Sequence, residues 1–235
     1  MDEPYVHKLF IGKVKQAGNE NATERMDRPW ESGIFKNETD ESIWLSKTGF
    51  SGDEVADKKN HGGLEKAVFA YPIKHYTFWK EELESDLIDM GTMGENFAVL
   101  EMDEFTVCIG DTYKIGEAII QVSQPRQPCW KPARRVQVMD FALRIQQSGR
   151  TGWYFRVLQE GHVQSGSDME LIERPYPQWS IAACNEVMHI YKDDLRLADD
   201  LASCDLLAGN WKRTLQKRLR GQDSNVGKRV FGPNK

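Results

Sequence analysis

A cysteine set among prolines is the first place in this sequence where chemistry is expected. Cys129 lies in the segment Ala118–Lys131, AIIQVSQPRQPCWK, after a run of β-favouring residues. Pro125, Pro128 and Pro132 restrict the backbone φ angle around it, and so they stiffen the loop that carries the thiol. A thiol held on a stiff loop is suited to bind a soft metal ion or to act as a nucleophile.

Basic residues surround this cysteine in the sequence. Arg126, Lys131, Arg134 and Arg135 all lie within six residues of Cys129. A cationic neighbourhood favours the thiolate over the thiol. The alternative is that Cys129 is a small buried hydrophobic residue, as most free cysteines are. The residues alone leave both interpretations open.

A second candidate site is the polar segment 51–63, SGDEVADKKNHGG, which ends in two glycines. Gly62 and Gly63 allow a positive φ angle, so that successive backbone N–H groups can converge on an anion. Lys58 and Lys59 add charge that suits a phosphate. The H-G-G motif also occurs in ordinary turns, so on its own it does not distinguish an anion nest from a turn.

Two further polar residues are candidates for binding a ligand. Asn96, in the segment 90–97 (MGTMGENF), has a donor and an acceptor that can bind a heterocycle, although asparagine more often stabilises a turn. Arg156 is the single charge within the predicted strand 151–158, TGWYFRVL. A buried arginine needs an anionic partner. The sequence does not decide whether that partner is a structural acid or a ligand phosphate.

The elements that position these residues are predicted to be mainly β. Short β-favouring runs separated by glycines and polar turns recur from residue 6 to residue 172, which is typical of a barrel. The run 118–122 ends a meander at the cysteine loop. Apolar residues at spacings of three and four predict a helix from Pro72 to Leu83, and the same period returns after Pro132 up to Gly149.

Beyond Pro175 and Pro177 the pattern becomes helical throughout. Helices are predicted at residues 180–190, 194–203 and 206–220. Ser180 is placed to cap the first of them. The predicted division is a β-barrel domain at 1–176, a three-helix subdomain at 177–222 and a flexible basic tail at 223–235. Such short amphipathic helices bury little alone, so we expect them to pack on each other or on the barrel.

Composition excludes several classes of protein. The 235 residues are 40% hydrophobic and carry a formal charge of −5, which suits one large globular domain, or one domain with a small one added. The four cysteines form no C-x-x-C pair, and Cys108, Cys184 and Cys204 are expected to be packing residues. There is no P-loop, G-x-G-x-x-G, G-x-S-x-G or H-E-x-x-H motif.

Charge and hydropathy also bear on location and partners. Neither a signal peptide nor an apolar run long enough for a membrane helix is visible, so a cytoplasmic protein is expected, with no membrane contact. Eight Lys or Arg and one acid lie between Trp211 and Lys235. This stretch is predicted to be a solvated helix end, and the alternative is a docking element for an acidic partner. Nucleic acid is not expected as a partner.

Several motifs occur together in an order that resembles a known family. They are GDEVADKKNHGG, MGENF, QPRQPCWK and SGRTGWYFRVLQEG, followed by the three predicted helices. This combination, over about residues 8–220, resembles the MOSC domain proteins, and specifically their YiiM-like bacterial branch. The resemblance implies a MOSC-type β-barrel domain with peripheral helices that binds the molybdenum cofactor, molybdopterin.

Carried over by position, the resemblance implies that Cys129 is the molybdenum ligand. It implies a cofactor site formed by Lys59, Asn60, His61, Gly62 and Asn96, with Arg126 and Gln127 near it. Arg156 is added as a candidate partner of the cofactor's phosphate. His61 is also a candidate catalytic residue, as a proton source, because the pKa range of histidine suits that task.

The implied activity is the reduction of small N-hydroxylated compounds, including hydroxylaminopurine-type base analogues. Electrons are expected from a separate flavin or iron–sulfur reductase. One alternative is a carrier that binds the cofactor or a sulfur atom and passes it on without turnover. Another is a metal-free thiol enzyme, which needs a histidine beside Cys129. No histidine is near Cys129 in the sequence.

Overall fold

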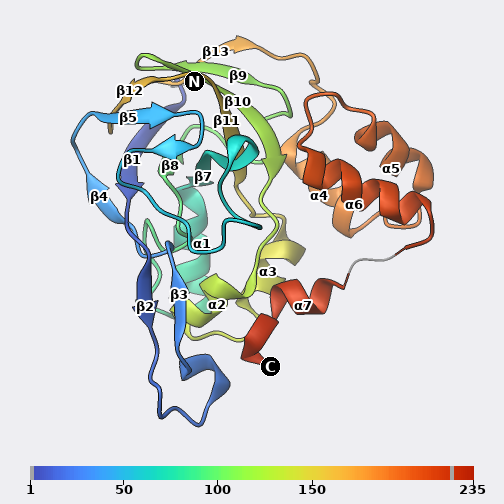
Figure 1. Cartoon of the computed structure of the whole chain (residues 1–235). Coiled ribbons are helices and arrows are strands. Elements are labelled where there is room, and N and C mark those ends of the chain that lie inside the picture. The colour runs from blue at the N-terminus through green and yellow to red at the C-terminus, as the bar shows by residue number, and fades with distance from the viewer. Residues whose placement is uncertain (1–2, 223–224) are drawn as a thin grey trace.

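A large curled sheet of mixed strand direction forms the centre of the protein. The computed structural model describes residues 3–222 and 225–235. The strands of this sheet are β1 (Tyr5–Ile11), β4 (Asn37–Thr39), β7 (Val68–Pro72), β8 (Phe97–Leu100), β9 (Thr112–Ile115), β10 (Ala118–Pro125), β11 (Trp153–Gln159) and β13 (Glu170–Glu173). They follow one another in the order β13-β9-β10-β11-β7-β8-β1-β4, and β7 and β8 run parallel. The sheet curls into a half-barrel (Figure 1), which confirms the predicted fold class.

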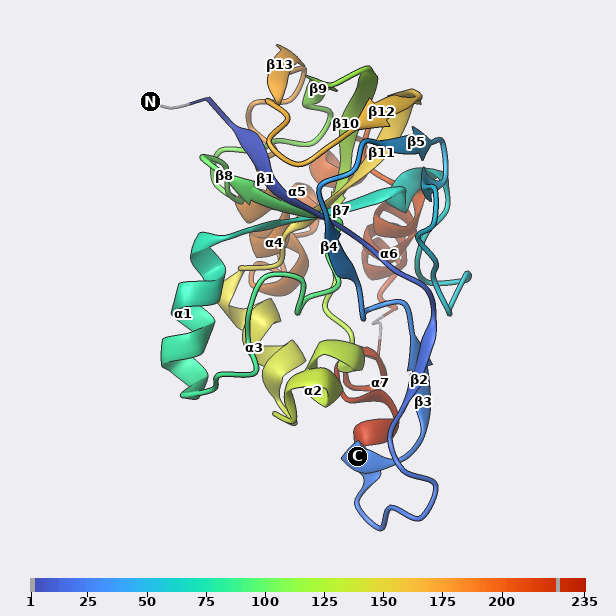
Figure 2. The same ribbon diagram turned by 90° about the vertical axis from the view of Figure 1, so that its left-hand side faces the viewer.

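Two smaller sheets extend this centre. The first contains β5 (Ile43–Ser46), β6 (Gly49–Phe50) and β12 (Gly161–Val163). The second is a ribbon of β2 (Lys15–Ala17) and β3 (Trp30–Ser32), which extends away from the main sheet (Figures 1 and 2). The ribbon ends beside α2, because the ring of Trp30 lies 5.7 Å from that of Trp130.

Three helices cover one end of the sheet with a separate apolar cluster. They are α1 (Lys74–Leu83), α2 (Trp130–Val136) and α3 (Phe141–Ser148), and they lie together in Figure 2. Trp79 of α1 and Phe141 of α3 pack edge to face in this cluster, with ring centroids 5.1 Å apart. The helix predicted at Pro72–Leu83 is confirmed. The helical stretch after Pro132 is two helices, because Gln137 takes a positive φ of 60° and ends α2.

The predicted three-helix C-terminal subdomain is present. It consists of α4 (Ile181–His189), α5 (Leu195–Ala202) and α6 (Gly209–Leu219). As expected, Ser180 caps α4 by accepting a hydrogen bond from the N–H of Ala183. These helices do not form a core of their own. Cys184 and Trp211 belong to the same buried cluster as Val122 of the sheet.

The segment predicted to be a flexible tail, 223–235, contains short helical elements, and its flexibility stays a prediction. Residues 223 and 224 lie outside the described residues. From Asn225 the chain forms α7 (Val226–Val230) and a 3-10 turn, Gly232–Asn234, in which Val230 and Asn234 are buried. This segment returns to α2 (Figure 1), where the Asn234 side chain donates to the Trp130 carbonyl at 3.3 Å. Burial of these two residues packs the segment against the rest of the protein.

Short 3-10 helices complete the described structure at Arg25–Asp27 and Leu64–Lys66. Cys108, Cys184 and Cys204 are buried, in agreement with the packing role predicted for them. Among residues 3–222 and 225–235, no helix combines the length and the apolar character needed to cross a membrane.

Candidate functional site

The cysteine loop is held at the end of β10. Every residue of β10 except Ile119 is buried, and its last residue, Pro125, pairs with Trp153 of β11. The next residue, Arg126, donates its backbone N–H to the Gly152 carbonyl at 3.0 Å. Cys129 then directly precedes α2 and is half-buried. The backbone of the cysteine loop is therefore held between β10 and α2.

The structure places a histidine against this thiol. Sγ of Cys129 lies 3.7 Å from Nε2 of His61, which is within hydrogen-bond reach for sulfur. The two residues are 68 positions apart, so their pairing has no local signal in the sequence. A metal-free thiol enzyme requires such a histidine, so this geometry is compatible with that alternative.

Two effects of opposite sign act on the pKa of the Cys129 thiol. Burial is the larger single effect, and it raises the pKa of the thiol because desolvation disfavours the charged form. The hydrogen bond and the electrostatic interaction with His61, the charge of Arg126 and the backbone N–H of Lys131 together outweigh burial and lower the pKa of the thiol to about 6. The thiolate is thus the main form at neutral pH, as metal ligation or nucleophilic attack requires.

Asp57 organises the loop that carries His61. Its backbone carbonyl accepts the N–H of His61 at 2.9 Å. Its carboxylate accepts the N–H of Lys59 at 3.1 Å and the side-chain amide of Asn60 at 2.8 Å. Nδ1 of His61 is buried, has no hydrogen-bond partner in the described part of the chain, and lies 3.8 Å from the Asp57 carboxylate, which is ion-pair distance. Sequence reasoning missed Asp57, although its place four residues before His61 was a usable signal.

A cavity of about 750 Å³ opens on one side of Cys129 and His61. Arg126 lines it, is 5% exposed, and has a buried Nη1 without a hydrogen-bond partner among the described residues. Gly62 and Gly63 line it with φ angles of 70° and 80°, so the positive φ predicted for an anion nest is present. We name this space the first cavity.

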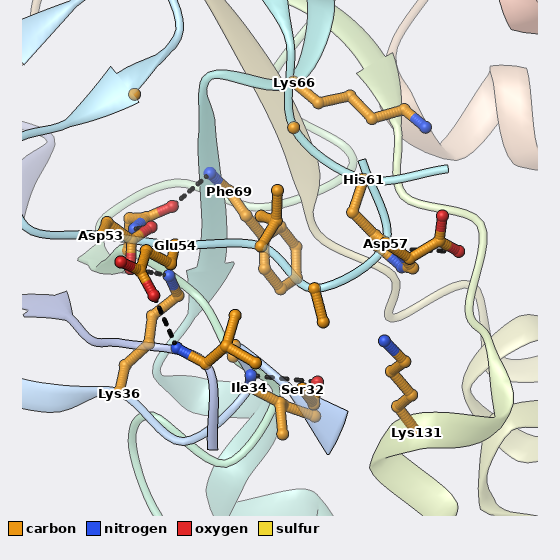
Figure 3. Close-up of a pocket in the computed structure, with 18 of the residues that line it drawn as sticks. Ser32, Ile34, Lys36, Asp53, Glu54, Asp57, His61, Lys66, Phe69 and Lys131 are labelled. Atoms are coloured by element: carbon orange, nitrogen blue, oxygen red, sulfur yellow. Dashed lines mark hydrogen bonds and ion pairs between the residues drawn. The ribbon is translucent and has the colours of Figure 1, made fainter. Parts of the chain in front are cut away.

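Lysines add positive charge to the first cavity. Lys66 and Lys131 approach the loop of Asp57 and His61 from two sides (Figure 3). Burial lowers the pKa of Lys66, while the charges of Cys129 and Asp57 act to raise it. Cations, an unpaired guanidinium N–H and positive-φ glycines together form a site suited to a phosphate-bearing ligand.

A second cavity, of about 790 Å³, adjoins the first, and Asp57, Lys66, Lys131 and Tyr154 are among the residues that line both. Cys129 and His61 line both spaces. The predicted cofactor-binding residues are divided between the cavities. Gly62, Asn96 and Arg126 line only the first, whereas Lys59, Asn60 and Gln127 line only the second.

Asn96 lies in the wall of the first cavity, but its amide is already used. Its Oδ1 accepts the N–H of Phe69 at 3.1 Å, and its Nδ2 donates to the Phe10 carbonyl at 3.2 Å and to Asp53 at 2.9 Å. These bonds join the residue before β8 to β7, to β1 and to Asp53. The amide of Asn96 therefore has a structural role, but it joins distant segments and does not stabilise its own turn as the alternative predicted. Behind it, a largely buried ion pair between Lys36 and Asp53 also lines the cavity and had no local signal in the sequence.

Arg156, which was predicted to bind the cofactor's phosphate, has protein partners in the structure, and its role at the cofactor stays a prediction. It lines neither cavity. Its guanidinium pairs with the Glu65 carboxylate and donates to Gln121 at 2.8 Å and to the Leu206 carbonyl at 2.8 Å. The structural acid, one of the two partners left open, is the partner observed.

Comparison with known proteins identifies two matching families. The MOSC domain family matches residues 57–170, and the family described as YiiM-like, 3-alpha helix domain matches residues 179–222. Protein YiiM of Escherichia coli (strain K12) is 35% identical over 204 residues, which cover 86% of this chain and 91% of that protein.

Two further similarities concern a longer protein and a solved structure. A protein of Gibberella moniliformis (strain M3125 / FGSC 7600) named Reductase is 40% identical over 179 residues, 75% of this chain but only 31% of that protein. The crystal structure of YiiM from Geobacillus stearothermophilus has a TM-score of 0.76 and 34% identity, covering 92% of this chain and 99% of that chain.

Proposed function

This chain belongs to the MOSC domain family, in its YiiM-like branch, and from that premise we propose that it reduces N-hydroxylated compounds with a molybdenum cofactor bound at Cys129. Hydroxylaminopurine-type base analogues are the proposed substrates. The observation that carries the proposal is a cysteine of lowered pKa on the wall of a cationic cavity. The name Reductase of the fungal relative agrees with this activity.

The residues of the first cavity fit the molybdenum cofactor. A thiolate is a soft ligand of the kind that molybdenum bound by a dithiolene accepts. The cofactor's phosphate needs cations and backbone N–H groups, and Arg126, Lys66 and the Gly62–Gly63 turn supply both. A Cβ atom built on Gly63 would meet nothing within 4 Å, so there is open space beside this turn. Arg126 Nη1, which has no partner within the described part of the chain, gains one when an anion binds.

Each residue then has a defined task in the reduction. When bound, the cofactor would supply the two electrons of the reduction. Cys129 would hold the metal, and Arg126 and Lys66 would orient the phosphate. His61, whose Nε2 faces Sγ of Cys129, holds a proton beside the position of the leaving oxygen. The overall reaction adds two electrons and two protons, breaks the N–O bond and releases water.

We place the source of electrons outside this chain, in a separate flavin or iron–sulfur reductase. Among the described residues no group of three or more His, Cys, Asp or Glu side chains is arranged to hold a metal ion. The part of the longer fungal relative that this chain does not match leaves room for additional domains in that protein. The identity of the donor here is a proposal to be tested by reconstitution.

Reductase activity of the reconstituted protein tests the proposal. Protein from a host that makes the cofactor is supplied with a chemical electron donor and 6-hydroxylaminopurine, and formation of adenine is measured. We expect turnover in the wild type, loss of turnover in Cys129→Ser, and turnover in the matched control Cys204→Ala, whose thiol is buried in the helical subdomain. Full activity in Cys129→Ser contradicts the proposed ligation. Bound molybdenum without turnover favours the carrier alternative.

A metal-free thiol enzyme is the second candidate, because His61 lies within reach of Cys129. It predicts that protein from a host lacking the cofactor is as active as the molybdenum-loaded protein. The reductase predicts activity only in the loaded protein. The same pair of preparations therefore separates the two candidates.

A further inference from the structure

We propose that the second cavity binds the substrate, and that its preferred occupant is a nucleoside monophosphate carrying the hydroxylamino group rather than the free base. This inference rests on the proposed function and adds the position and the class of the substrate. Its starting point is that Cys129 and His61 line both cavities. Of the residues assigned to the cofactor, Gly62 and Arg126 line only the first cavity, whereas Lys66 lines both.

The C-terminal segment forms one wall of the second cavity. Asn225, Lys228 and Arg229 line it, together with Asn210 of α6. Arg229 is tied down by its hydrogen bonds to the Pro128 carbonyl and to Gln146. The wall contributed by α7 therefore has a fixed position next to the cysteine loop. The volume of about 790 Å³ is within the range of small-molecule sites, about 300–1,000 Å³.

The charge of this cavity favours an anionic ligand. Its basic side chains are Lys59, Lys66, Lys131, Lys228 and Arg229, and its acidic ones are Glu31 and Asp57. The Asp57 carboxylate is already occupied by hydrogen bonds from its own loop. Lys59 and Lys228 are exposed at the rim. Lys66 is assigned to the cofactor's phosphate and Arg229 is bonded to Pro128 and Gln146, so Lys59, Lys131 and Lys228 remain for a phosphate group that enters from solvent.

The inner wall favours an aromatic group with an N–H donor. Trp30, Trp130 and Tyr154 give the cavity three aromatic side chains. Gln124 also lines it and is 1% exposed, and its Oε1 is buried with no hydrogen-bond partner among the described residues. A buried acceptor without a partner destabilises the fold unless a ligand donates a hydrogen bond to it.

A single chemical class meets all three requirements. A purine offers an aromatic ring and N–H donors, its hydroxylamino group carries the N–O bond to be broken, and a 5′-phosphate supplies the anion. The reaction is unchanged: two electrons from the donor and two protons convert the N–OH group to N–H and water. The product of a hydroxylaminopurine nucleotide of the adenine series is adenosine 5′-monophosphate.

The inference is tested by kinetics and by binding. Reduction of 6-hydroxylaminopurine, its ribonucleoside and the ribonucleoside 5′-monophosphate is compared in the molybdenum-loaded protein. We expect kcat/KM to be about ten-fold higher for the monophosphate than for the base, since one good phosphate contact is worth about 1.4 kcal/mol. In Lys59→Glu/Lys228→Glu this preference disappears, and in the control Lys217→Glu, an exposed lysine of α6, it is retained.

Calorimetric binding of adenosine 5′-monophosphate gives a readout that needs no turnover. We expect the wild type and Lys217→Glu to bind it and Lys59→Glu/Lys228→Glu to bind about ten-fold more weakly. Equal affinity in all three proteins, or no binding in the wild type, overturns the inference. If the base is reduced and the monophosphate is not preferred, the inference fails while the proposed function stands. If adenosine 5′-monophosphate binds as expected but no N-hydroxylated compound is reduced, the proposed function fails.

Discussion

At the scale of single residues, the electrostatics of Cys129 determine what the site can do. A half-buried thiol without partners would have a raised pKa, since burial disfavours the thiolate. The interactions with His61 and Arg126 reverse the direction of this pKa shift and bring the pKa of the Cys129 thiol to about 6. Metal binding needs this thiolate, so the same two residues prepare the chain for the cofactor before it binds.

The lowered pKa gives a direct prediction for metal-free protein. The pH dependence of Cys129 alkylation by iodoacetamide should have its midpoint at about pH 6, well below the ordinary thiol value of about 8.5. In His61→Gln the midpoint should move towards the ordinary value. In the control His162→Gln, which removes an exposed histidine, it should not move.

The sign of the accompanying stability change follows from linkage. The folded pKa of Cys129 lies below that of the unfolded chain, so ionisation of this thiol stabilises the fold. That contribution is fully present above the unfolded pKa and is lost as the pH falls through about 6. A wild-type alkylation midpoint near pH 8.5 would contradict this account of the thiol.

Some of the site residues were predictable from the sequence and others were not. Cys129 and Arg126 stand out through their local context of prolines and cations. The pairing of His61 with Cys129 depends on folding across 68 positions, which no local pattern encodes. Arg156 shows the converse, because its strand pattern predicts partial burial of the charge but not that Glu65 is its partner.

At the scale of elements, the C-terminal segment binds the cysteine loop on both sides of Cys129. Arg229 donates to the carbonyl of Pro128, the residue before Cys129, and Asn234 donates to the carbonyl of Trp130, the residue after it. The composition of this segment suggested a tail without fixed structure. The buried apolar residue of this segment is Val230. One apolar residue does not make a periodic pattern from which a packed helix could be predicted.

Loss of the hydrogen bond from Asn234 to the Trp130 carbonyl should make the cysteine loop more mobile. Asn234→Ala is expected to lower the free energy of unfolding by about 1 kcal/mol, the usual effect of losing a hydrogen bond. It should also speed alkylation of Cys129 in metal-free protein at pH 9, where the thiol is ionised in every variant. Lys235→Ala, at the adjacent exposed position, serves as the control. Equal alkylation rates in the two variants would show that the segment does not restrain the loop.

At the scale of the whole molecule, the sheet and the three helices share one apolar core. The helices were predictable because each carries a cap or a clear apolar period, as with Ser180 before α4. Their docking onto the sheet was not, since it depends on residues far apart in the sequence. The boundary predicted near residue 176 therefore separates a strand-forming sequence pattern from a helical one. The apolar core nevertheless continues across this boundary.

Arg156 links these two parts and gives a prediction for stability. Its guanidinium joins Glu65 and Gln121 to the Leu206 carbonyl, at the start of the chain leading into α6. Arg156→Ala should lower the free energy of unfolding by about 2–4 kcal/mol, because it leaves partly buried acceptors unpaired. Chemical denaturation measures this change, with Arg220→Ala, an exposed arginine, as the control.

Molybdenum content provides a second readout for Arg156. Folded Arg156→Ala protein should bind as much molybdenum as the wild type, since Arg156 lines neither cavity. A selective loss of molybdenum without a loss of stability would show that Arg156 contributes to cofactor binding.

The central claim is that the sulfur of Cys129 holds molybdenum, and metal analysis tests it most directly. Wild-type protein, Cys129→Ser and Cys204→Ala are purified from one host that makes the cofactor, and the molybdenum in each is measured per folded chain. The account predicts close to one molybdenum per chain in the wild type and in Cys204→Ala, and a loss of most of it in Cys129→Ser. Equal molybdenum in all three proteins would contradict it.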